Sequence, residues 1–142
     1  MSFTNHMKNK AKELAELSIK PLDGYTYHNQ DNKDKYLSVG RGVLRSIAKH
    51  YQLKEYKVNV NPAGIAVSGD ITLIGMFNDH KGIYIHMSEP RLNFRSYSSP
   101  VFYFRSVSHI KDYSGGLNHW MTYTRLAQDL EAACDEMKRM VS

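Results

Sequence analysis

The middle of this chain has the alternating apolar pattern of β-strands, and the segments between its apolar runs are short. Apolar residues alternate with polar ones at Tyr56, Val58 and Val60, and residues 61–64 have the composition of a turn. Further apolar runs occupy residues 65–67, 71–77, 83–87, 92–97 and 101–107. Because the connections are too short for crossover helices, the pattern predicts an antiparallel meander of about four to six strands.

Two helices are predicted before the strands. Residues 3–18 place their apolar side chains on one side of a helix, which Pro21 ends. Residues 25–34 are polar and have the composition of an exposed loop. Apolar residues then recur at steps of three and four between Lys35 and Gln52, which predicts a second amphipathic helix.

The second predicted helix contains two glycines and a row of cations. Gly40 and Gly42 each weaken a helix by about 1 kcal/mol relative to alanine, so they mark either a close packing point or a later helix start. Arg41, Arg45 and Lys49 follow one another at intervals of four residues and form a basic ridge. This ridge is either a solvated outer face or a surface that meets an anion.

The C-terminal segment has the strongest helical pattern. Its apolar residues, at steps of four and three, are Leu126, Leu130, Ala133, Met137 and Met140. We therefore expect a single α+β domain over residues 1–142, in which two N-terminal helices and a long C-terminal helix pack on one face of the sheet. The other face would remain open for binding.

Residues 90–111 form the segment that is most informative about function. They contain no acid and four cations, Arg91, Arg95, Arg105 and Lys111. Between the cations lie five aromatic residues, Phe94, Tyr97, Phe102, Tyr103 and Phe104. Cations attract anions, and aromatic faces stack on bases or guanidinium groups, so this composition indicates binding to a polyanion or an acidic protein surface.

Strand geometry divides this segment between two faces. Alternate residues of a strand point to opposite sides, so Phe102 and Phe104 should share one face while Tyr103 and Arg105 share the other. We expect the phenylalanines to lie in the core and the opposite side to be functional. A single binding patch further requires Arg95 and Arg105 to lie on the same face.

A glycine-rich segment at residues 112–120 offers a second candidate surface. Its paired glycines allow a close backbone approach, and successive amides there could bind an anion. Asn118, His119 and Trp120 would then shape the edge of the binding site. The alternative is a structural turn whose tryptophan fills the seam between the sheet and the last helix.

The seven histidines raise the possibility of catalysis. His86 lies in a His-x-Ser sequence of the form used by two-histidine phosphoesterases, whereas His119 is followed by one residue too many. A phosphodiesterase of this kind needs both imidazoles at one phosphate, one as the base and the other as the acid. The alternative is that these are ordinary surface or hydrogen-bonded histidines.

Charge and cysteine content restrict the class of protein. The net charge of +5 permits binding to nucleic acid or to an acidic partner. The single Cys134 excludes an internal disulfide and every multi-cysteine metal site, and it suits a reducing cytosol. The sequence has neither a signal peptide nor the ~20 apolar residues of a membrane span. We expect a cytoplasmic, soluble protein without a cofactor or a metal.

The chain resembles the small accessory proteins that phages and conjugative elements encode. It is tyrosine-rich and lysine-rich and lacks a catalytic signature, and residues 112–118 are similar to a D-Y-T/S-G-G-x-N turn of mobile-element proteins. The resemblance implies a non-enzymatic, anti-CRISPR-like inhibitor of a host nuclease complex. Unlike the acidic anti-CRISPRs that mimic DNA, this basic chain would grip RNA, DNA or an acidic protein face. A general nucleic-acid-binding module and a histidine-dependent phosphodiesterase are the alternatives.

Overall fold

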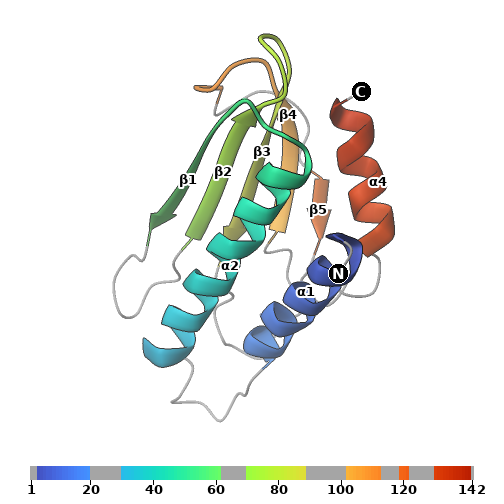
Figure 1. Cartoon of the computed structure of the whole chain (residues 1–142). Coiled ribbons are helices and arrows are strands. Elements are labelled where there is room, and N and C mark those ends of the chain that lie inside the picture. Colours follow the sequence, from blue (N-terminus) through green and yellow to red (C-terminus); the bar gives the residue numbers. More distant parts are fainter. Residues whose placement is uncertain are drawn as a thin grey trace.

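The computed structural model describes residues 3–19, 30–61, 70–88, 102–112, 119–121 and 130–141. Its helices are α1 (Phe3–Ile19), α2 (Gln30–His50) and α4 (Leu130–Val141). Its strands are β1 (Glu55–Asn61), β2 (Asp70–Met76), β3 (Gly82–Ser88), β4 (Phe102–Val107) and β5 (His119–Met121). The five strands form one antiparallel sheet in chain order (Figure 1). The predicted α+β class is confirmed, and the strand order is that of a meander.

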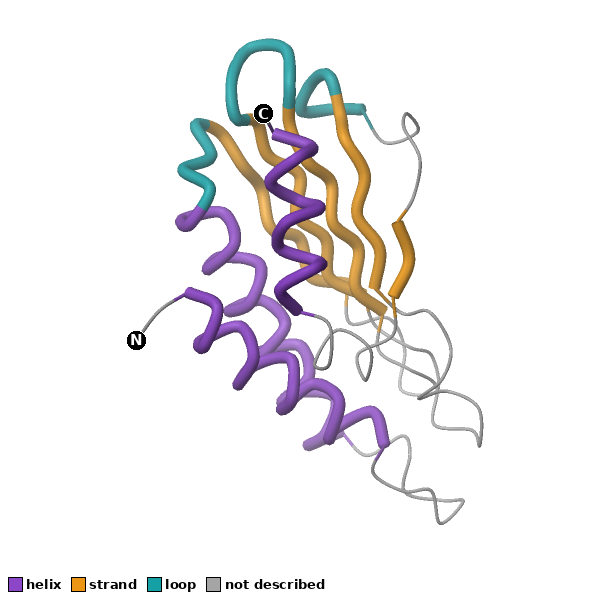
Figure 2. The backbone as a smooth tube through the Cα atoms, turned by 90° about the vertical axis from the view of Figure 1, so that its right-hand side faces the viewer, coloured by secondary structure: helices purple, strands orange, loops and turns teal. Residues whose placement is uncertain are grey.

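The helices lie together on one face of the sheet (Figure 2). α2 packs across β1 and β2, α4 packs across β3 and β4, and α1 contacts both of the other helices. The fold therefore has two layers. No helix of the described residues covers the second face of the sheet, which we call the open face.

Alternation along the strands separates the core from the open face. The strand residues buried beneath the helices are Ile71, Leu73, Ile83, Ile85, Met87 and Phe104. The helix residues buried with them include Met7, Leu14, Tyr36, Leu44, Ile47, Ala133 and Met137. The prediction that Phe104 lies in the core is confirmed, whereas the side chain of Phe102 lies outside the described residues.

Gly40 is the close packing point between α2 and the sheet. A Cβ atom on Gly40 would overlap Cδ1 of Ile71 and would lie 3.5 Å from Cε of Met87. A Cβ atom on Gly42 would meet nothing within 4 Å. α2 runs through both positions, so a later helix start is wrong and the packing interpretation of Gly40 is confirmed.

Two helix boundaries differ from the sequence-based expectation. α2 begins at Gln30, whereas the polar residues up to Asp34 predict a loop. Nucleation is the costly step of helix formation, so an existing helix gains another turn without an apolar stripe. α4 has 12 residues and is the shortest of the three described helices, so the expectation of a long helix is wrong. The spacing of apolar residues identifies the buried side of a helix but does not determine where the helix begins and ends. Leu126, the first apolar residue of the predicted helix, lies outside the described residues.

The end of α2 turns the chain directly into β1. Gln52 has a φ of 54°, in the left-handed region. The N–H of Leu53 donates to the carbonyl of Ala48 at 3.0 Å, and the N–H of Gln52 donates to the carbonyl of Lys49 at 3.1 Å. These two bonds define a Schellman motif, and Leu53 is buried in the same core cluster as Ala48. The tight reversal places α2 and β1 side by side.

The predicted strands at residues 65–67 and 92–97 lie outside the described residues. The hairpin between β2 and β3 lies within them. The amide Oδ1 of Asn78 accepts hydrogen bonds from the backbone N–H groups of His80 and Lys81, both at 2.8 Å. This local capping fixes the connection that the sequence predicts.

Candidate functional site

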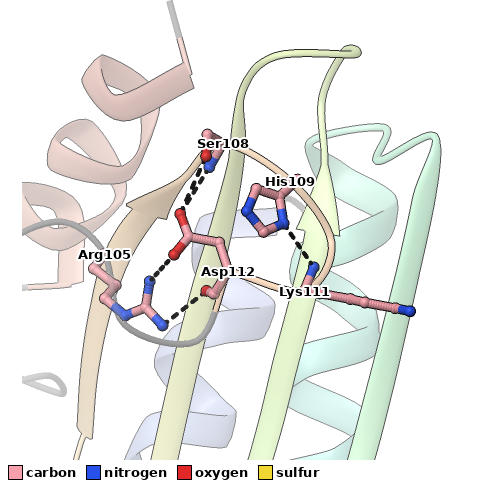
Figure 3. A network of polar contacts seen from close by, with 5 residues as sticks. All are labelled: Arg105, Ser108, His109, Lys111 and Asp112. Atoms are coloured by element: carbon pink, nitrogen blue, oxygen red, sulfur yellow. Dashed lines mark hydrogen bonds and ion pairs between the residues drawn. The ribbon is translucent and has the colours of Figure 1, made fainter.

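Arg105, a member of the predicted basic patch, is buried on the open-face side of the sheet with 3% of its surface exposed. Its Nη2 donates to the carbonyl of Asp112 at 2.9 Å, and its Nη1 lies 3.9 Å from Oδ1 of the same residue (Figure 3). The guanidinium carbon also lies 4.5 Å from the ring centroid of Tyr84. An arginine with these contacts holds the fold together, so the prediction of an exposed charge at Arg105 is wrong.

Asp112 is the first acid after the acid-free segment, and a turn brings it back to β4. Its N–H donates to the carbonyl of His109 at 3.0 Å. Its Oδ2 accepts from the N–H and the Oγ of Ser108 at 3.1 and 3.3 Å. Lys111 donates its N–H to Nδ1 of His109 at 3.3 Å, while its exposed side chain extends away from the network (Figure 3). Lys111 therefore keeps an exposed charge, and Arg105 does not.

Tyr103 lies on the open face, as predicted, within an open-face aromatic cluster formed by Tyr84, His86 and Tyr103. The rings of His86 and Tyr103 stack with centroids 4.9 Å apart and an interplanar angle of 22°. The ring centroids of Tyr84 and Tyr103 are 6.1 Å apart. All three side chains are partly exposed. Partly exposed aromatic rings on a sheet can stack on a planar ligand group.

An acid accompanies this cluster. Oδ2 of Asp70 lies 3.6 Å from Nε2 of His86, and Asp70 is partly exposed at the start of β2. The open-face aromatic cluster thus lies beside a carboxylate and a buried, paired arginine. With Asp70 nearby and Arg105 paired with Asp112, these residues do not form the cationic patch that the sequence predicts.

The alkaline stability of the fold is expected to depend on Tyr84. Burial, aided by the neighbouring Tyr103, raises the pKa of Tyr84 from 10.0 to about 12, although Arg105 opposes the rise. Between these two pH values the unfolded chain loses the phenolic proton before the folded chain does, so stability falls as the pH rises. Tyr84→Phe should make the decline in urea midpoint between pH 10 and 11.5 shallower.

Tyr56→Phe is the matched control for this prediction, because Tyr56 is an exposed tyrosine of β1. It should leave the decline unchanged. Part of the decline remains in both variants, since burial also raises the pKa of Tyr51 to about 12. An identical slope in the wild type and Tyr84→Phe would contradict the assignment.

His119 lies on the helix-covered face. Its ring stacks on Phe104 at a centroid distance of 5.1 Å, and its Nδ1 lies 3.0 Å from Oε1 of Glu136 on α4. His86 instead stacks on Tyr103 on the open face. The two histidines are on opposite faces of the sheet, so the structure does not bring them together at one phosphate as the two-histidine mechanism requires. Among the residues that the structure describes, no group of three or more His, Cys, Asp or Glu could hold a metal ion.

The predicted basic ridge forms on α2. Arg41, Arg45 and Lys49, which we call the α2 ridge, are exposed, and none has an ion pair within the described part of the chain. α1 contacts a different side of α2, where Nε2 of His6 lies 3.1 Å from Oγ of Ser46. At 3.6 residues per turn, Arg45 and Lys49 lie on the side of α2 opposite Gly40, which packs on the sheet, so the α2 ridge faces away from both α1 and the sheet.

β1 carries two exposed apolar residues. Tyr56 and Val60 are 40% and 36% exposed, and they lie on the helix side of the sheet, because their strand neighbours Gly75 and Ile71 do. Sequence reasoning treated both as ordinary strand residues. The signal that would have identified them is their place in the first strand of a meander, which has a neighbour on one side only.

The remaining candidate residues are not brought into one site. The structure leaves Arg91, Arg95, Tyr97, Asn118 and the side chain of Trp120 outside the described residues. The requirement that Arg95 and Arg105 share a face therefore remains a prediction. The described candidates are distributed over α2, the two faces of the sheet and the turn after β4.

These elements define a two-layer α+β protein with its helices on one sheet face. Comparisons of the chain with protein families, with curated proteins and with solved structures find no match. No described helix has the length and apolar character needed to cross a membrane. Function is therefore inferred from the two surfaces, the α2 ridge and the open-face aromatic cluster.

Proposed function

We propose that this protein is a non-enzymatic binding protein that inhibits a host nucleic-acid-targeting defence complex, in the manner of anti-CRISPR proteins. It acts in the cytoplasm of the host cell and grips an acidic protein face or the nucleic acid of that complex. The α2 ridge is the observation that carries this proposal. It gathers exposed cations that have no ion pair among the described residues, on a chain with a net charge of +5.

The charge pattern distinguishes the α2 ridge from the other cationic positions. The helix contains no acid between Arg41 and Lys49. On α1, by contrast, Nζ of Lys10 lies 3.4 Å from Oε2 of Glu13, and on α4 the cations Lys138 and Arg139 follow closely after two acids. Uncompensated cations in a row raise the local concentration of an anionic partner and speed its association. The α2 ridge is therefore the favoured site of contact.

The open-face aromatic cluster favours a second candidate, a general nucleic-acid-binding module. Partly exposed aromatic side chains on a sheet without covering helices are the arrangement on which unpaired bases stack. The neighbouring Asp70 carboxylate and the pairing of Arg105 reduce the positive charge available for phosphates there. Such a module would bind nucleic acid with a steep dependence on salt and little selectivity for one partner.

Reversal of two ridge charges tests the proposal. Tagged wild type and an Arg41→Glu/Arg45→Glu variant are used to capture partners from a host lysate, with and without nuclease treatment, and are assayed for loss of host immunity. The double reversal is expected to reduce nuclease-resistant capture of one defence complex by about ten-fold, because two ion pairs become repulsive contacts. Inhibition of immunity should fall with it.

The matched control is Lys8→Glu/Lys12→Glu on α1, which changes the net charge by the same amount at the same spacing. Both lysines are exposed, so the fold should tolerate this change. Equal loss of capture in both variants would mean that net charge alone explains the effect. It would contradict the α2 ridge as the binding site. Recovery of bulk nucleic acid that nuclease removes would favour the general nucleic-acid-binding module.

A further inference from the structure

The side of α2 that faces away from the sheet is polar and charged. It consists of exposed residues, which we call the outer face of α2: Ser38, Arg41, Gly42, Arg45 and Lys49. Positions three and four apart are neighbours on a helix, so these residues form one continuous strip. The contact of Gly40 with the sheet and the contact of Ser46 with α1 lie outside this strip. The outer face of α2 is therefore accessible to a partner.

Gly42 has no role in the packing of the described residues. A Cβ atom on Gly40 would overlap Ile71, whereas a Cβ atom on Gly42 would meet nothing within 4 Å. Glycine within a helix is less favourable than alanine, so the fold alone would gain from a side chain at position 42. The missing side chain leaves the helix backbone uncovered next to Arg45, and glycine at such a position allows a ligand to approach closely. Gly42 thus indicates a partner that lies close against the outer face of α2.

The outer face of α2 lacks the side chains that a protein partner or an unpaired base would use. The exposed large apolar side chains of the described residues are Tyr56 and Val60, and both lie on β1. The core of a protein–protein interface is apolar and aromatic, and unpaired bases stack on aromatic rings. Phosphate groups, by contrast, are bound by arginine, lysine and hydroxyl side chains. The three cations and the hydroxyl of Ser38 therefore suit a phosphodiester backbone.

The spacing of the cations suits a DNA duplex. Arg41 and Lys49 are separated by about 12 Å along the helix axis. Each strand of B-DNA presents a phosphate about every 3.4 Å along the duplex axis, so the row spans about three phosphates of one strand. The nearest acid on α2 is Asp34, about 10 Å before Arg41. An α-helix fits the major groove of B-DNA, whereas the major groove of A-form RNA is too narrow, and this difference favours DNA.

We propose that the outer face of α2 binds the phosphate backbone of double-stranded DNA. Arg41, Arg45 and Lys49 pair with phosphates of one strand, and the helix backbone at Gly42 lies in close contact with that strand. This inference rests on the proposed function and names its partner as duplex DNA held within the defence complex, where bound protein shields it from nuclease. Phosphate contacts position the protein without reading the DNA sequence.

Neutralisation of two cations tests the phosphate contacts. Wild type and Arg41→Gln/Arg45→Gln are titrated into a labelled DNA duplex of mixed sequence, and fluorescence anisotropy is recorded over a range of salt concentrations. The variant is expected to bind about ten-fold more weakly. Because two phosphate contacts are lost, the slope of log K against log salt should become shallower by about 1.8. The exposed pair Lys8→Gln/Lys12→Gln, which removes the same charge from α1, should leave both values unchanged.

Enlargement of Gly42 tests the close contact without a change of charge. Gly42→Gln adds a long side chain with good helix propensity, so the variant should be at least as stable as the wild type. It is expected to weaken DNA binding about five-fold, and Gly42→Ala should have a smaller effect in the same direction. Urea denaturation of each variant separates binding from folding. Unchanged DNA affinity in Gly42→Gln would overturn the close contact at this glycine.

Other nucleic acids and the host complex supply the remaining outcomes. Equal or tighter binding of an RNA duplex or of a single strand would overturn the assignment to duplex DNA. If capture of the host complex depends on Arg41 and Arg45 but DNA affinity does not, the α2 ridge contacts an acidic protein face and only the proposed function stands. If DNA affinity depends on these arginines but capture does not, duplex binding stands and the proposed function fails.

Discussion

Asp112→Ala is expected to lower the free energy of unfolding by about 3 kcal/mol, because it leaves a buried guanidinium without its counter-ion. Arg105 is almost fully buried, and it contacts both the carbonyl and the carboxylate of Asp112. The substitution also removes the acceptor for the Ser108 N–H and hydroxyl. Urea denaturation followed by circular dichroism measures the loss.

Two further variants identify the origin of this loss. Lys111→Ala changes an exposed cation in the same turn and should alter stability by less than about 0.5 kcal/mol. Arg105→Met in the Asp112→Ala background should restore part of the loss, because it removes the unpaired charge. If the second substitution instead adds its own full penalty, the Ser108 contacts and not the buried charge explain the effect.

Gly40→Ala is expected to destabilise the protein by about 2 kcal/mol, even though alanine favours helices more than glycine. The added methyl group would overlap Cδ1 of Ile71 in the contact between α2 and the sheet. Relief of this overlap requires either an unfavourable Ile71 rotamer or a displacement of α2 from the sheet. Thermal and urea unfolding should both report the loss.

Gly42→Ala supplies the matched control on the same helix. Its new methyl group would meet nothing within 4 Å, so only the helix propensity changes. We expect a gain in stability of about 1 kcal/mol. A similar response at both glycines would mean that the packing of Gly40 on Ile71 does not limit the approach of α2 to the sheet.

Local periodicity was sufficient to predict most of the architecture. The alternation in β4 correctly separates Phe104 from Tyr103, because successive strand residues face opposite sides whatever surrounds them. The four-residue spacing likewise identifies the α2 ridge, whose members need only a shared helix. These features depend on local geometry.

The state of each charge depended on contacts that residue types and spacing do not reveal. The acid-free segment ends at Lys111, and the acid that neutralises Arg105 is the next residue, returned by a turn. His119 is directed towards Glu136 through the pairing of β5 with β4, which no histidine spacing encodes. Burial and pairing are tertiary properties, and they decided which predicted cations remained available.

The two edges of the sheet are unequal, and this limits the stoichiometry of any strand exchange. Growth of a sheet through successive molecules needs an accepting edge at both ends. β1 offers seven residues to a new neighbour, whereas β5 at the opposite end has three. Within the described residues, β1 therefore offers the longer edge to an added strand, and the three residues of β5 offer little length for passing the sheet on to a further molecule.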